Sequence, residues 1–251
     1  MEIEFVCLAN SRLQDGRSVA GLRTDGGGWV RIVGPNGPLA KKHYTMEGGC
    51  ETEILDVVKA ETLGSRPVNH QPENYVASGP RGGFLGPILD SIFGFPRWKP
   101  AGHAEPANAP GILDPLIRKG SDLFGTQRDR GELSAFDGRP AMTSLTMIEP
   151  DSPTWEITSA FRGQRAERQV RARFTLDGAE YSLPVSDPRW EERCSPLDYG
   201  NYDNEHILVG EEDRLLLTVS LDEPFYGNNP SGECYKSIVG VIHLRGAKAS
   251  K

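Results

Sequence analysis

The chain has 251 residues, of which 37% are hydrophobic and 25% are charged, as in an ordinary folded globular protein. This length accommodates one large β domain or two domains of about half that size. No apolar run of about 18 residues occurs, so a membrane-spanning helix is not expected. The acidic, alternating start Met1–Phe5 predicts a strand rather than a signal peptide, and we therefore expect a cytoplasmic protein.

The charge is unevenly distributed along the chain. The formal net charge is −7, to which residues 1–140 contribute −1 and residues 141–251 contribute −6. This acidic balance argues against a protein that coats nucleic acid by bulk positive charge. It is still compatible with a local basic groove on an acidic body.

The cysteines indicate reduced thiols rather than a metal centre. They are Cys7, Cys50, Cys194 and Cys234, and no two of them form a Cys-x-x-Cys pair. Structural zinc sites need close pairs, so we expect neither a metal nor another cofactor.

Three short strands joined by tight turns are predicted at the N-terminus, over residues 4–9, 18–23 and 29–33. The turns contain Asp15-Gly16 and the run 25–28, where glycine adopts positive φ without a Cβ clash. Such a meander begins a small barrel or a curled sheet.

Polar residues at the strand ends of this meander form a first candidate group. They are Asn10, Arg12, Arg17 and Arg31, with Trp29 beside them. Long hydrogen-bond donors next to an aromatic ring suit contacts with phosphates and bases. In the alternative interpretation, the tryptophan belongs to the core and the arginines form a solvated rim.

A long strand rich in β-branched residues is predicted over residues 52–60. The next segment, Arg66–Tyr75, contains two prolines that keep its middle out of a helix. Its polar residues either line a site or bond the backbone of an ordered loop. They are His70, Gln71, Glu73 and Asn74.

Several short motifs resemble the dual-OB-domain family of bacterial proteins. They are Leu8–Arg12, Gly16-Arg17, Ala20-Gly21, Trp29–Arg31, the segment 70–74 and the Cys-Tyr-Lys run at 234–236. The resemblance covers both ends of the chain and most of 141–244, but little of 77–139. It implies two OB-like barrels and nucleic-acid binding. It also implies work beside helicase- or nuclease-type proteins in mobile and anti-phage loci.

Residues 77–139 differ in character from the flanking segments. Glycine and proline make up 18 of these 63 residues, which predicts a linker or a flap laid over one barrel. Short helices are expected at 84–93 and 121–125. The aromatic residues, among them Trp98 and Phe124, indicate that parts of the segment pack.

Alternating patterns return after residue 143. Strands are predicted at 144–148, 154–157, 170–176, 179–185, 214–221 and 234–244. Asp177-Gly178 between two alternating runs predicts a two-residue hairpin, and Tyr181 alternates into the core. A helix should begin at Pro188, capped by Ser186 or Asp187, which is an OB-like position for a helix.

A second candidate group lies in the acidic half. It comprises Arg162, Arg165, Arg168, Arg171 and Arg173. A basic strand and loop beside an open barrel face would track a phosphate backbone. The alternative is a solvated face paired with the acids Glu156, Glu167 and Glu180.

Lys236 is a third candidate, on the assumption that the last strand pairs with the first. Enzymatic motifs are absent from the sequence: there is no phosphate-binding Gly-x-x-x-x-Gly-Lys loop, no His-Glu-x-x-His and no Gly-x-Ser-x-Gly. We therefore expect a binding protein rather than an enzyme.

Together these patterns predict a mainly β protein with two OB-like antiparallel barrels, a few short helices and a long Gly/Pro-rich connection. The expected boundaries are 1–76, 77–140 and 141–251. The expected function is binding of single-stranded or structured DNA or RNA, as an accessory to a separately encoded enzyme. The alternatives are a protein-interaction module without nucleic-acid contact, which the acidic charge favours, and a small-molecule or nucleotide sensor.

Overall fold

The computed structural model describes residues 1–14, 16–78, 98–104, 109–136, 143–162, 165–227 and 230–246. The chain divides into two units, Met1–Glu105 and Pro106–Lys251, and each has its own hydrophobic core. The helix expected at 84–93 lies outside the described residues. Within the described ranges, no helix has the length and apolar character needed to cross a membrane.

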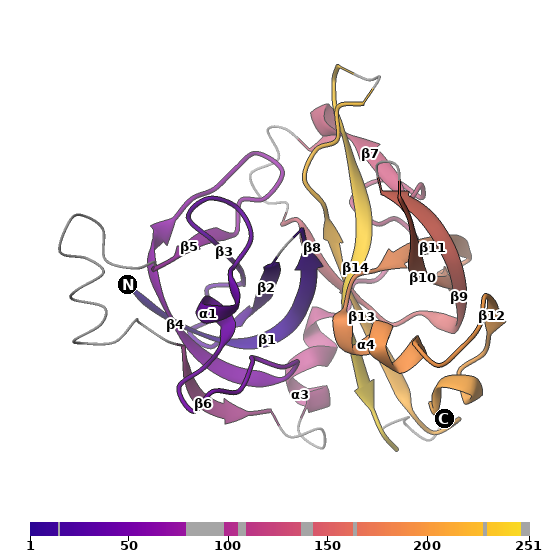
Figure 1. The fold of residues 1–251 in the computed structure, drawn as a ribbon, viewed down its shortest axis with the longest axis horizontal. Helices are drawn as coiled ribbons and strands as arrows, with labels where there is room; N and C mark the ends of the chain where they lie inside the picture. Colours follow the sequence, from indigo (N-terminus) through magenta and orange to yellow (C-terminus); the bar gives the residue numbers. More distant parts are fainter. Residues whose placement is uncertain are drawn as a thin grey trace. The chain divides into compact units, whose positions relative to one another are not determined.

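The first unit is a closed five-stranded barrel (Figure 1). Its elements are β1 (Glu2–Leu13), β2 (Gly16–Arg23), β3 (Trp29–Val33), α1 (Lys41–Tyr44), β4 (Asp56–Ser65) and β5 (Asn74–Ala77), with β6 (Lys99–His103) added at the edge of β4. The strand order is β1-β2-β3-β5-β4, and a further pairing of β1 with β4 closes the ring.

β1 closes the barrel because it serves two neighbours. Residues 2–6 pair with β4 and residues 5–13 pair with β2, and a bulge between Cys7 and Ala9 bends the strand. At Gly21 a Cβ would lie 1.9 Å from the carbonyl oxygen of Val6, so only glycine allows this close approach of β2 to β1. Phe5 fills the interior and meets Trp98 edge-on at 6.0 Å.

The second unit repeats this strand order without repeating the sequence. Its strands are β7 (Arg130–Glu132), β8 (Leu145–Ile148), β9 (Asp151–Arg162), β10 (Arg165–Leu176), β11 (Ala179–Val185), β12 (Gly200–Tyr202), β13 (Arg214–Leu221) and β14 (Glu233–Leu244). Its helical segments are α3 (Ala109–Leu113), η1 (Asp114–Leu116), η2 (Leu133–Ala135), α4 (Pro188–Cys194) and η3 (Glu205–Ile207). The order β9-β10-β11-β14-β13 matches β1-β2-β3-β5-β4, and each unit has its helix after the third of these strands.

In the second unit, β8 and β9 together take the place of β1. β8 pairs with β13, and β9 pairs with β10. Between them lie Glu149 and Pro150, and proline has no N–H for a ladder. Ser152 follows with φ of 43°, so the backbone turns sharply where β1 is only bulged.

Local turn and cap chemistry explains the strands and helix that the sequence predicted here. Asp177 and Gly178 have φ of 45° and 85°, as the predicted hairpin between β10 and β11 requires. Asp187 caps α4, and Pro188 is its first residue. These predictions are confirmed.

Three expectations about secondary structure differ from the structure. The strand expected over 52–60 begins only at Asp56, after a turn in which Leu55 has φ of 73°. The barrels are not purely antiparallel, because β3 runs parallel to β5 and β11 parallel to β14. Residues 121–125 form a tight turn, bridged between Leu123 and Thr126, instead of a turn of helix. Phe124 has φ of 55° there, which no helix allows.

The segment 77–140 is not one separate region. β6 pairs with β4 and belongs to the first unit, whereas β7 pairs with β14 and belongs to the second. Leu123, Phe124 and Phe136 are buried in the core of the second unit. The division between the units therefore lies at Glu105–Pro106, inside the expected connection.

Candidate nucleic-acid interface

Two arginines face each other at the hairpin end of the first barrel. Arg12 on β1 is the direct cross-strand partner of Arg17 on β2. Arg12 is exposed, and the Arg17 guanidinium lies 5.9 Å from the centre of the Tyr44 ring. In the part of the chain that the structure describes, the buried Nε of Arg17 has no hydrogen-bond partner. Like charges directly opposite each other repel, so this pair places two positive charges at one end of the barrel.

The helix α1 adds two lysines to this end of the barrel. The backbone of Arg17 pairs with Leu39, next to the start of α1, and Lys41 and Lys42 are both exposed. The ion pair of Lys41 with Glu51, at 2.9 Å, raises the pKa of Lys41, and the charge of Arg17 opposes that rise. These lysines were not among the residues selected from the sequence, although two adjacent lysines after a turn were a signal that could have found them. We call Arg12, Arg17, Lys41 and Lys42 the basic end.

The other two members of the first candidate group contribute differently. Asn10 is turned toward the protein, since its Nδ2 donates to the carbonyl oxygen of Thr52 at 2.7 Å. Trp29 is half-buried at the start of β3.

Arg31 is buried rather than exposed on a binding face. Only 5% of the residue is accessible, and its Nε lies 3.4 Å from Oε1 of Glu73, which is buried as well. Its Nη1 also donates to the hydroxyl of Ser18 at 3.4 Å. The structure therefore brings one residue of the first candidate group together with one from the segment 70–74.

The polar residues of that segment hold an ordered loop. The carbonyl oxygen of Glu73 accepts from the Arg31 N–H at 2.9 Å, and Asn74 Nδ2 donates to Gln71 Oε1 at 3.1 Å. His70, Gln71, Glu73 and Asn74 are all buried. These contacts favour the loop interpretation of the segment over one in which it lines an open site.

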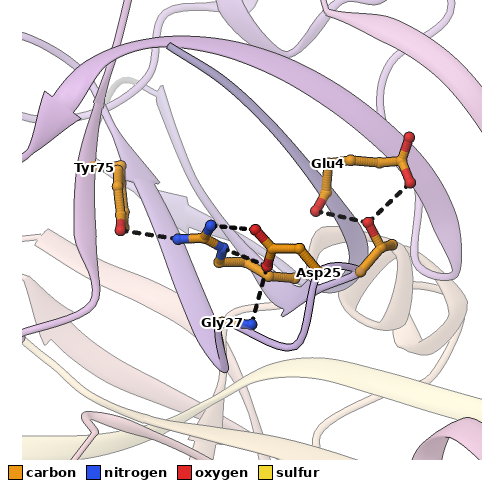
Figure 2. A network of polar contacts seen from close by, with 6 residues as sticks. Glu4, Asp25, Gly27 and Tyr75 are labelled. Atoms are coloured by element: carbon orange, nitrogen blue, oxygen red, sulfur yellow. Dashed lines mark hydrogen bonds and ion pairs between the residues drawn. The ribbon is translucent and has the colours of Figure 1, made fainter.

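A second arginine network fixes the β2–β3 turn (Figure 2). Arg23 donates from Nη1 to the Tyr75 hydroxyl at 3.1 Å and forms an ion pair with Asp25 through both Nε and Nη2. Asp25 also accepts from the Gly27 N–H at 2.9 Å, and these bonds lower its pKa. Thr24 Oγ1 donates to the Glu4 carboxylate at 2.8 Å. The network ties the turn to β1 and β5.

Most of the arginines in the second candidate group form hydrogen bonds or ion pairs within the protein. Arg168 donates to the carbonyl oxygens of Cys194 and Leu197, at 2.9 and 2.6 Å, at the end of α4. Arg171 bonds to the Ser182 hydroxyl and carbonyl oxygen, and Arg173 forms a 2.9 Å ion pair with Glu156. This last contact is one of the acid pairings weighed above. Arg162 and Arg165 flank the β9–β10 turn, and their side chains lie outside the described structure.

Lys236 points into the second barrel and does not line an open groove. It is fully buried, and its Nζ donates to the carbonyl oxygens of Thr126 and Arg128 at 2.6 and 2.5 Å. The ammonium lies 5.6 Å from the Tyr181 ring centre, and burial lowers the pKa of Lys236 to about 8. β14 pairs with β11, β13 and β7 among the described strands, so the assumed pairing of the last strand with the first is wrong. Lys236 instead holds the segment 126–128 in place.

A histidine–aspartate pair in the second unit is held by hydrogen bonds on both imidazole nitrogens. His243 Nε2 lies 2.7 Å from Asp213 Oδ2, and Arg193 Nη1 lies 3.0 Å from His243 Nδ1. Arginine only donates, so Nδ1 accepts and Nε2–H donates to Asp213. The bond from His243, together with the N–H groups of Gly246 and Gly210, lowers the pKa of Asp213 to about 2. With Arg193 on Nδ1, the imidazole has no free nitrogen to act as a base.

Comparison with known proteins gives one match. A family model described as a dual OB-containing domain matches residues 3–83 and 90–241, which is nearly the whole chain. No curated protein and no solved structure matches the chain.

Proposed function

Because the chain belongs to the dual OB-containing domain family, we propose that it binds nucleic acid through the basic end of its first barrel. OB barrels commonly bind oligonucleotides along their second and third strands and the loops beside them. The observation that supports this surface most is the direct pairing of Arg12 with Arg17. Two arginines at directly paired positions can contact neighbouring phosphates of a strand.

We further propose that the protein is an accessory to a separately encoded helicase- or nuclease-type enzyme, in anti-phage defence or repair. Single-stranded or structured DNA or RNA fits this role. The arginines of β10 are weaker candidates for the contact, since Arg168, Arg171 and Arg173 already bind carbonyl, hydroxyl or carboxylate groups of the protein.

The test is fluorescence anisotropy with labelled single- and double-stranded DNA and RNA at two salt concentrations. The double variant Arg12→Gln/Arg17→Gln should bind roughly tenfold or more weakly. On a single strand, the slope of log affinity against log salt should fall by about 0.7 for each phosphate that the variant no longer binds. Stability should change by less than about 1 kcal/mol, because the substitution also removes a like-charge pair.

The matched control is Lys99→Gln/Lys119→Gln, which removes the same number of charges from two exposed positions outside the basic end. It should bind nearly as well as the parent protein. If the arginine variant binds as tightly as the control, the basic end is not the site. If the parent binds none of the four nucleic acids at low salt, the proposed function itself fails.

A further inference from the structure

Two neighbouring aromatic side chains are exposed on the connection between β13 and β14. Phe225 is 60% and Tyr226 is 54% accessible. The backbone around them is ordered by a pair of bonds, from the Phe225 N–H to the Glu233 carbonyl oxygen at 2.8 Å and from the Glu233 N–H back to Phe225 at 3.0 Å. Large apolar groups that stay in water beside such a pair of backbone bonds indicate a binding surface.

Two glycines give the rings their positions. A Cβ at Gly227 would lie 2.5 Å from the Phe225 ring, and one at Gly232 would lie 3.0 Å from the Tyr226 ring. Each ring therefore lies against bare backbone on one side. We call Phe225 and Tyr226 the platform.

A half-buried tyrosine and an arginine support the platform. The Phe225 ring meets the Tyr235 ring at 6.4 Å, with 65° between the planes. Arg130 on β7 donates to the Tyr235 hydroxyl at 2.7 Å, and its guanidinium lies 5.2 Å from the Tyr235 ring centre. This arginine thus stacks on the inner ring and leaves the outer two rings open.

The charge beside the platform is negative. Glu132 on β7 is the direct cross-strand partner of Glu233 on β14, and Glu223 is exposed on the same connection. Arg130 offsets part of this charge, because it lies 3.6 Å from Asp129 and 3.7 Å from Glu233. Two carboxylates held opposite each other favour a cation and repel a phosphate, just as the two arginines of the basic end favour an anion.

We propose that Phe225, Tyr226 and the carboxylates around them form a docking site for an arginine- or lysine-bearing segment of a partner protein. The cationic side chains would lie over the two exposed rings, and the carboxylates would take the remaining charge. This site is on a different unit from the basic end and does not depend on the proposed nucleic-acid contact. It gives the protein a separate surface for recruiting an enzyme.

The probes are a labelled peptide of alternating arginine and glycine, its glutamate counterpart and an oligothymidine of equal length. The parent should bind the arginine peptide best. Phe225→Ala/Tyr226→Ala should weaken that binding roughly tenfold without changing the net charge of the protein. Gly227→Ala keeps both rings but displaces Phe225, and it should weaken binding as well. Leu63→Ala is the matched control because it removes another side chain that is 71% exposed.

Three results would overturn the proposal. In the first, the parent does not bind the arginine peptide. In the second, the aromatic variant binds the peptide as tightly as the parent, so that attraction is only the general acidity of the chain. In the third, the oligothymidine is preferred and its binding needs Phe225 and Tyr226, which would make the platform a base-stacking surface.

Discussion

The Asp187 carboxylate holds two elements at once. Its Oδ1 accepts from the N–H groups of Arg189 and Trp190, at 3.0 and 3.3 Å, and so caps α4. Its Oδ2 accepts from the Val241 N–H on β14 at 2.9 Å. The residue is 3% exposed, and burial raises its pKa against the effect of these three bonds. A residue selected from the sequence as a cap is therefore also the anchor of the helix to the barrel.

The two roles of Asp187 can be separated by substitution. Asp187→Ala should lower the free energy of unfolding by about 2–4 kcal/mol, because a cap is worth about 1 and a buried N–H without a partner costs a further 1–3. Asp187→Asn keeps a single acceptor oxygen, so it should lower the free energy of unfolding by less than the alanine variant does. Urea unfolding followed by circular dichroism measures both. A loss below about 1 kcal/mol for the alanine variant would mean that water replaces the carboxylate.

At the scale of an element, the loop 66–73 is held over the outer face of β3. Val30 and Ile32 lie in the core, so Arg31 between them points to the opposite face, where it meets Glu73. An ion pair with both side chains buried is marginal as a source of stability, yet removing one partner takes away the ion pair of the other buried charge, which is strongly destabilising. We therefore assign the pair a positioning role for this loop.

Glu73→Gln should destabilise the protein by about 3 kcal/mol and should speed amide exchange across the loop 66–73. The double variant Arg31→Met/Glu73→Leu, which removes both charges, should be less destabilised than Glu73→Gln. Glu47→Gln, at an exposed position, is the control. If the single and double variants are equally stable, the ion pair does not hold the loop.

At the scale of the whole molecule, the limits of the units follow from contacts rather than from composition. The second barrel needs residues before 141, because Lys236 donates to carbonyl groups at 126 and 128 and β7 extends β14. Tyr181 also bonds into this segment, to the carbonyl oxygen of Ser121 at 2.6 Å. Removing the segment would leave the Lys236 ammonium buried without acceptors.

Fragment 106–251 should therefore fold and unfold in one cooperative transition, whereas fragment 141–251 should not. Circular dichroism during urea unfolding, together with one-dimensional proton NMR, distinguishes the two results. Lys236→Met in fragment 141–251 tests the cause, because it should recover part of the lost structure. If the unmodified fragment 141–251 unfolds cooperatively, the second barrel does not need residues 106–140, and these residues would only connect the two barrels.

The sequence placed the strands of both barrels well where local chemistry decides them. Alternation predicted β11, Asp177-Gly178 predicted the hairpin, and Asp187-Pro188 predicted the start of α4. It could also have placed Lys236 inside the barrel, because Cys234 and Ile238 on the same side of β14 are core residues. The exposed pair Phe225–Tyr226 was also readable, as two aromatics beside a glycine between two strands.

By itself, then, the sequence determined the mainly β class and most strand positions, because turns, caps and alternation depend on near neighbours. The two OB-like barrels followed from the resemblance of its motifs to the family. The tertiary structure decided which arginine and lysine side chains are bound within the protein. Alternation shows that Arg31 faces outward but not that a distant loop covers it. It likewise cannot show that Arg168 ends on the carbonyl groups of α4, or that Arg12 and Arg17 stand opposite each other. Register and loop packing join residues far apart in the chain, and they determine whether a charge binds the protein itself or a ligand.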